Sequence, residues 1–224
     1  MRFTVRTVLL VCILSVCSYG VSAFGDDPFS PPWYGEPGTT HAEYNFDPGS
    51  DPFNPPVPPD AWVGPGDPPE ADIVFGPGMD YQEAWGGRVG VVPLSGQIII
   101  DVPNYPLPNP YKEIWIQLIW AAQDVDKVPS VWAEASGFVV HPTEFIDEVI
   151  LEPTGELPPA DGNWIHSTYR IIIEPNPASE TIYISGSIMV DRLVFDTWCV
   201  PEPATLSLLG LGGAAILLRW RRKK

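Results

Sequence analysis

Neighbouring carboxylates are the residues of this sequence that most resemble a catalytic pair. Asp147 lies next to Glu148, and Asp124 is separated from Asp126 by one valine. Glycoside hydrolysis needs two carboxyl groups about 5 to 10 Å apart across a cleft. Sequence spacing alone does not place either pair in that way, and a chain with 28 acidic residues offers many accidental pairs.

The sequence lacks the motifs of the common enzyme classes. It has no Gly-x-Ser-x-Gly, no His-Glu-x-x-His, no phosphate-binding loop, no dinucleotide fingerprint and no Cys-x-x-Cys. The three histidines, His41, His141 and His166, are isolated from one another along the chain. We therefore predict that the protein is not an enzyme and has no catalytic residues, with a glycoside hydrolase as the alternative.

The acidic side chains could also bind a cation, because carboxylate oxygens are ligands of Ca²⁺. Asp124 and Asp126 lie in a predicted loop and are the candidates for such a site. Their segment does not match the twelve-residue calcium loop, which has a central glycine and a closing glutamate. We predict no resident metal or cofactor, with Ca²⁺ as the alternative.

The charge of the chain excludes one class of partner. All 28 acidic residues lie between the two hydrophobic ends, and five cations accompany them: Arg88, Lys112, Lys127, Arg170 and Arg192. A mature body of this composition has a net charge near −23. Because phosphate attraction requires Lys and Arg, we predict no nucleic-acid partner.

The C-terminal stretch, residues 199–224, has three parts in a fixed order. Val200, Pro201, Glu202 and Pro203 come first, and an uncharged apolar run follows from Ala204 to Leu218. The chain then ends on a basic tail that contains Arg219, Arg221, Arg222, Lys223 and Lys224. An apolar run with a basic end favours a short transmembrane helix whose tail stays in the cytoplasm. An uncleaved C-terminal anchor is the alternative interpretation.

This order of parts resembles the PEP-CTERM sorting signal of exported bacterial proteins. Pro201, Glu202 and Pro203 match its Pro-Glu-Pro box, residues 204–218 its helix and residues 219–224 its tail. The resemblance implies that an exosortase, a membrane-embedded protease, recognises the box and removes the helix and the tail. It also implies a membrane-anchored precursor, a final location at the cell surface or in the extracellular matrix, and bacteria that make extracellular polysaccharide.

The other end of the chain has the three regions of a secretory signal peptide. Two arginines precede an apolar run from Val8 to Cys17, and the small residues Val21, Ser22 and Ala23 follow. We predict cleavage between Ala23 and Phe24. Cys199 is then the lone thiol of the mature chain, so no intrachain disulfide forms. Lipidation or an intermolecular bridge at Cys199 is the alternative to an inert neighbour of the sorting box.

Short apolar runs separated by glycine and proline predict an all-β fold. Residues 24–70 form a Pro/Gly/aromatic-rich segment with one strand at 39–46, which we expect to pack on the domain through Trp33 and Tyr34. Residues 71–198 contain most of nine or ten short strands and no amphipathic helix. The clearest strand is 111–121, in which Lys112 shares one face with Ile114 and Ile116 by alternation, and the last strand is predicted to end at Phe195. This pattern predicts a β-sandwich of the jelly-roll or Greek-key type. The predicted core residues are Val74, Ile98, Ile100, Ile114, Ile116, Leu118, Trp120, Trp132, Ile171, Ile173, Ile182, Ile184, Ile188, Val190 and Val194.

These observations favour a non-catalytic structural or adhesion protein of the cell surface or matrix. A carbohydrate-binding module that recognises exopolysaccharide is the second hypothesis, because exposed aromatic rings stack on sugars. Its candidate residues lie in or beside predicted strands: Tyr111, Trp115, Trp132, Trp164, Tyr169 and Tyr183. Aromatic residues more often fill a core, which is the competing interpretation.

Overall fold

The computed structural model describes residues 30–46, 56–76, 81–105, 109–123, 127–155 and 162–200. The chain divides into two compact units, Met1–Pro37 and Gly38–Lys224. In the first unit, residues 30–37 form a turn in which the amide of Tyr34 donates to the carbonyl of Pro31 over 2.9 Å. The predicted packing of Trp33 and Tyr34 on the β domain stays a prediction.

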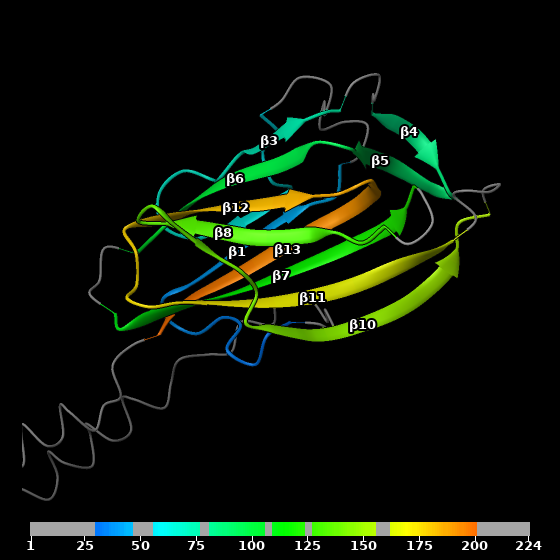
Figure 1. Ribbon diagram of the computed structural model, residues 1–224. Coiled ribbons are helices and arrows are strands. Elements are labelled where there is room, and N and C mark those ends of the chain that lie inside the picture. The colour runs from blue at the N-terminus through cyan, green and yellow to red at the C-terminus, as the bar shows by residue number, and fades with distance from the viewer. Residues whose placement is uncertain are drawn as a thin grey trace, which may run out of the picture. The chain divides into compact units, whose positions relative to one another are not determined.

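The second unit contains two antiparallel sheets, and its described residues form no helix (Figure 1). The larger sheet has eight strands. Six follow one another in the order β10 (Glu144–Pro153), β11 (Asn163–Ile173), β7 (Tyr111–Ala122), β13 (Ile188–Val200), β1 (Thr39–Tyr44) and β2 (Ala61–Val63). The hairpin of β4 (Gln82–Trp85) and β5 (Arg88–Leu94) joins this sheet where β5 pairs with β13. The five-stranded sheet has the order β3 (Ala71–Val74), β6 (Gln97–Pro103), β12 (Ser179–Ser185), β8 (Ser130–Ala135) and β9 (Phe138–Val140).

Alternation along the strands produces one core that both sheets share. In β7 the even-numbered residues from Ile114 to Trp120 are buried, and in β12 Ile182 and Ile184 are fully buried. Side chains from both sheets belong to a single apolar cluster. Burying a side chain such as isoleucine contributes about 1.5–3 kcal/mol, so this cluster is the main source of stability. The all-β prediction is confirmed.

Two residues of the predicted core lie elsewhere. Val74 is 47% exposed and Trp132 is only partly buried. Their neighbours Ile73 and Ala133 are buried instead, and adjacent residues of a strand point to opposite faces. Both predicted residues therefore lie on the outer face of the five-stranded sheet. The other thirteen predicted core residues are buried.

Strand boundaries also differ from the prediction. The sequence pattern does not predict β2 or β4, which have three and four residues and pair at the margin of the larger sheet. The last strand continues to Val200, whereas the alternating pattern predicted its end at Phe195. Asp196 and Thr197 are buried polar residues, so hydrophobicity does not reveal this part of the strand.

Several predictions fall outside the described residues. These include the signal peptide with its cleavage site at Ala23–Phe24, the hydrophobic run 204–218, the basic tail and the calcium candidates Asp124 and Asp126. Within the residues that are described, the structure contains no helix with the length and hydrophobicity needed to cross a membrane.

Candidate functional site

The last core strand leads directly into the predicted sorting box. β13 lies between β7 and β1, and its terminal residue Val200 is paired with Tyr111, the first residue of β7. Two residues earlier, Trp198 pairs with Thr39 of β1 and with Glu113 of β7. Pro201, Glu202 and Pro203 lie beyond the described residues. Because Val200 is held in the sheet, the box follows the folded body without a linker.

A polar cluster is buried beneath this end of β13. It consists of Asn104, Lys112, Asn176, Glu180 and Cys199, which come from four separate parts of the chain. Lys112 forms an ion pair with Glu180, and both side chains are fully buried. Lys112 also donates to the side-chain oxygen of Asn104 over 3.4 Å, while Asn104 donates to the side-chain oxygen of Asn176 over 3.0 Å. The thiol of Cys199 donates to the same Asn104 oxygen over 2.7 Å.

Burial dominates the electrostatics of the polar cluster. It raises the pKa of the Glu180 carboxyl above its ordinary value, and the nearby charge of Lys112 opposes that shift. Burial likewise raises the pKa of the Cys199 thiol, again against the effect of Lys112. Because the thiolate is the reactive form of cysteine, Cys199 is placed for packing and hydrogen bonding. Its side chain is 1% exposed, which does not suit lipidation or an intermolecular bridge.

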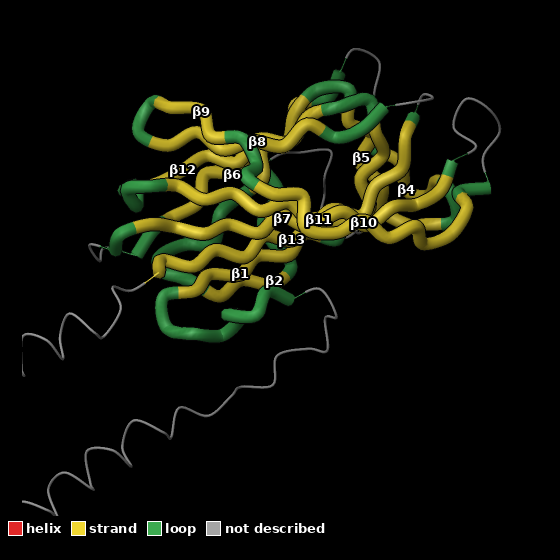
Figure 2. The backbone as a smooth tube through the Cα atoms, turned by 60° about the horizontal axis from the view of Figure 1, so that its bottom comes forward, coloured by secondary structure: helices red, strands yellow, loops and turns green. Residues whose placement is uncertain are grey.

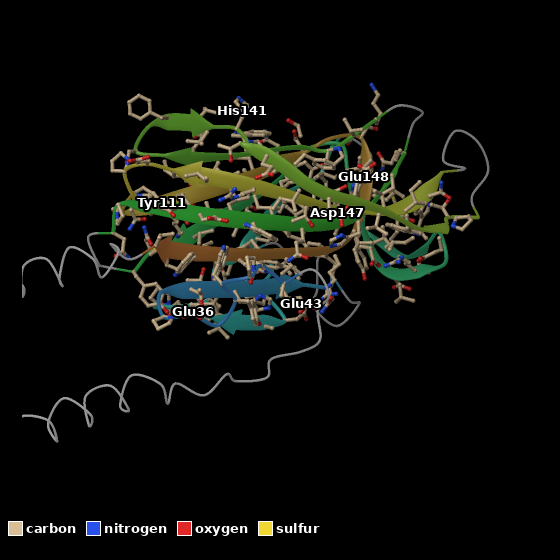
Figure 3. The ribbon with its side chains drawn as sticks, turned by 90° about the horizontal axis from the view of Figure 1, so that it is seen from below. Glu36, Glu43, Tyr111, His141, Asp147 and Glu148 are labelled. Carbon is tan, nitrogen blue, oxygen red and sulfur yellow. The ribbon has the colours of Figure 1, made fainter. Side chains whose placement is uncertain are left out.

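The carboxylate pair Asp147 and Glu148 does not converge on one site. The two residues are adjacent in β10, where consecutive side chains point to opposite faces (Figure 3). Glu148 faces Ser167, whose hydroxyl donates to it over 3.4 Å, whereas Asp147 is paired with Thr168. The geometry required for two carboxyls across a cleft is therefore not present at this pair.

Other acids line an open groove of about 950 Å³ beside β3 and β6. Its acidic residues are Asp67, Glu70, Asp72 and Asp101. In the part of the chain that the structure describes, no group of three or more His, Cys, Asp or Glu side chains is arranged to hold a metal ion. These four carboxylates make the groove acidic.

The histidines have separate surroundings. His41 shares a 2.8 Å hydrogen bond between its Nδ1 and a carboxylate oxygen of Asp196 across the β1–β13 pair. His166 is buried in β11, and His141 is exposed (Figure 3). The His41–Asp196 pair was not predicted, because Asp196 follows Phe195, the end of the predicted strand.

The six aromatic candidates divide between core and surface. Trp164 is fully buried and donates from Nε1 to the carbonyl of Gly86 over 2.8 Å. Burial raises the pKa of Tyr169 to about 12. Trp132 and Tyr183 are partly exposed on the five-stranded sheet and stack with a centroid distance of 5.2 Å and an interplanar angle of 5°. Trp115 and Tyr111 are partly exposed on the larger sheet, and Trp115 donates to Glu113 over 2.8 Å.

The comparison with known families bears on the end of β13. Residues 200–223 match the PEP-CTERM protein-sorting motif. The match begins at the last residue of β13 and covers the box, the apolar run and most of the basic tail. It confirms the resemblance drawn from the sequence and implies an exported protein that an exosortase, a membrane enzyme, sorts from a membrane-anchored precursor. No curated protein matches the chain.

Proposed function

We propose that this protein is a non-catalytic structural or adhesion element of the cell surface or extracellular matrix. The observation that carries the proposal is the junction at Val200, where the sorting motif begins on the last residue of a core strand. The folded body and the sorting motif are therefore continuous along the chain. Residues 1–23 act as a signal peptide, cleaved between Ala23 and Phe24, and residues 204–224 hold the precursor in the membrane until it is processed.

The roles of the motif residues follow from their chemistry. Pro201 and Pro203 flank Glu202, and each fixes one backbone dihedral and lacks an amide donor. This favours an extended backbone through the recognition box. The apolar run holds the precursor in lipid, and the five cations of the tail keep its end on the cytoplasmic side. The body has five cations among its 28 acids, which does not favour nucleic acid, so its proposed partners are the exosortase, the membrane and matrix components.

The strand order supports a jelly-roll body. Two sets of four strands are adjacent in the order β1-β13-β7-β11 and β6-β12-β8-β9. Numbered from 1 to 8 along the chain, these strands read 1-8-3-6 in one sheet and 2-7-4-5 in the other. Successive strands alternate between the two sheets except at the β8–β9 hairpin, as in a double Greek key. β2, β3, β10 and the β4–β5 hairpin are additions to this set. We infer that the predicted β-sandwich is of the jelly-roll type.

Processing tests this proposal. Replacing Pro201, Glu202 and Pro203 by alanine is expected to leave an unprocessed, membrane-retained chain in bacteria that contain the exosortase. A matched control replaces Glu36 and Pro37, an exposed Glu-Pro pair outside the motif, and is expected to be processed normally. Unchanged mass and location of the triple variant would show that sorting does not depend on the box.

A carbohydrate-binding role is the second candidate, and one observation favours it. The Trp132–Tyr183 stack lies partly exposed at the centre of an open sheet face, with the Tyr183 hydroxyl 3.4 Å from a Glu134 carboxylate oxygen. Lectin domains use jelly-roll folds, and polysaccharide accompanies the sorting family. Trp132→Ala is expected to abolish retention on exopolysaccharide, whereas Phe145→Ala, which removes a 50% exposed aromatic ring from the other sheet, keeps it. Absence of any signal on a glycan array, with and without Ca²⁺, would exclude this role.

A further inference from the structure

Six segments of the β unit meet at the end from which β13 leaves. The registers place the end of β13 beside the start of β7 and the start of β1, and the start of β12 beside the ends of β6 and β8. The end of β11 lies beside the start of β7. We call this region the exit end and define it by residues 38–39, 103–105, 109–111, 135–138, 173–179 and 198–200.

The exit end differs in charge from the rest of the body. Glu174 is the only charged residue within these described segments, although the sequence contains 28 acids. The nearest further charges on the adjoining strands include Lys112 and Glu180, which neutralise each other in the buried polar cluster. Glu113 is paired with Arg170, and Glu134 is exposed on the outer face of β8. Prolines, asparagines and the partly exposed rings of Tyr105 and Tyr111 account for much of the remaining surface. Tyrosine is typical of membrane–water interfaces, where one side of the ring is apolar and its hydroxyl stays hydrated.

A tight hairpin carries exposed apolar side chains at the same end. Ala135 pairs with Phe138, so Ser136 and Gly137 form a two-residue turn between β8 and β9 (Figure 2). Both turn residues have positive φ, 52° and 80°, as a type I′ turn requires. Phe138 is 74% exposed and Val139 is 54% exposed. A large apolar side chain held out by a tight turn is costly in water unless another apolar surface covers it.

The length of chain beyond β13 identifies what lies close to this end. Only Pro201, Glu202 and Pro203 separate Val200 from the apolar run that starts at Ala204. Four Cα steps reach at most about 14 Å. Once the run is in the bilayer, the exit end is therefore tethered next to the lipid headgroups.

We propose that, in the membrane-anchored precursor, the exit end lies against the bilayer and the β8–β9 hairpin inserts Phe138 among the lipid headgroups. This inference rests on the proposed function, since it requires the C-terminal anchor. The acidic remainder of the body is repelled by anionic lipid, whereas the nearly uncharged exit end is not. Contact at this end would orient the body on the membrane and present the sorting box in one geometry to the exosortase.

Three fluorescent probes in the full chain test the orientation. Cysteines carrying an NBD label are introduced one at a time at Val139, Val89 and Leu208, with Cys12 and Cys17 changed to serine. Val139 is in the hairpin at the exit end, and Val89 is an equally exposed valine (58%) in the β4–β5 hairpin at the other end of the sheets (Figure 2). Leu208 reports on the anchor. The chain is reconstituted into vesicles of phosphatidylethanolamine and phosphatidylglycerol that contain headgroup nitroxide lipid.

The inference predicts strong quenching at positions 208 and 139 and a several-fold smaller loss of fluorescence at position 89. Phe138→Asp is expected to bring quenching at position 139 down to the level at position 89, while its urea midpoint stays unchanged. Quenching at position 208 alone, or equal quenching at 139 and 89, overturns the inference and leaves the proposed function intact. No quenching at position 208 refutes the anchored precursor itself, and this inference with it.

Discussion

Removing the cation of the buried pair tests the polar cluster beneath the sorting motif. Lys112→Met keeps much of the side-chain volume but leaves the Glu180 carboxyl fully buried without its ion-pair partner. Breaking a buried ion pair in this way costs about 3–5 kcal/mol, because one charge stays uncompensated in the interior. An exposed pair would cost only about 0–1 kcal/mol. A buried pair and an exposed pair therefore predict clearly different losses in the free energy of unfolding.

Urea unfolding of the processed chain measures the free energy of unfolding of Lys112→Met against the wild type. For a body of this size the predicted loss corresponds to a fall in Tm of roughly 6–20 °C. The double variant Lys112→Met with Glu180→Leu is the control, since replacing both charges by apolar groups is expected to restore stability to about the wild-type level or above it. A loss below about 1 kcal/mol for the single variant would refute the burial of the pair.

The pH dependence of the same variant has a defined sign. Burial raises the pKa of Glu180 above its ordinary value of 4.5, with Lys112 opposing the shift. An acid with a raised folded pKa binds its proton more tightly in the folded state, so its contribution to stability is lost as pH rises from 4.5 through the folded pKa. Without Lys112 this loss is larger. The penalty of Lys112→Met is therefore expected to be smaller at pH 4 than at pH 7, and a penalty that is constant with pH would contradict this account.

Two further predictions concern close packing and the lone thiol. A methyl group at Gly96 would lie 1.8 Å from the carbonyl oxygen of Val74, so Gly96→Ala is expected to lower the free energy of unfolding by about 1–3 kcal/mol or more. At Gly162 an added methyl group meets no atom of the described residues within 4 Å beyond its chain neighbours, so Gly162→Ala is expected to change the free energy of unfolding by under about 0.5 kcal/mol in urea. Equal effects of the two variants would contradict the close contact at Gly96. Cys199, 1% exposed and with a raised pKa, is expected to react with iodoacetamide only after the processed chain is unfolded, as followed by mass spectrometry. Rapid labelling of the folded chain would place the thiol at the surface.

Local patterns made most of the fold predictable. The alternation from Tyr111 to Ala121 predicted the clearest strand and grouped Lys112 with Ile114 and Ile116 on one face. The structure places that face in the core, so the burial of Lys112 follows from the pattern. The pairing of Lys112 with Glu180 could not be predicted, because an ion pair between two sheets depends on the fold and leaves no pattern in the local sequence.

The wrong assignment of Trp132 to the core also has a physical cause. Side chains of residues 130–136 point alternately to the two faces of the strand, but the pattern does not show which face is buried. Because Trp132 has a large apolar ring, it was assigned to the core. The structure buries Val131 and Ala133 instead and leaves Trp132 to stack on Tyr183 outside. The sorting motif, by contrast, was readable because it is linear and needs no tertiary contact for its recognition.

The intact mass of the protein isolated from its own extracellular fraction tests the central claim most directly. The account predicts a chain that starts at Phe24 and lacks the apolar run and the basic tail, residues 204–224. A chain of full length, with residues 1–23 and 204–224 still attached, would contradict export and sorting through the C-terminal motif.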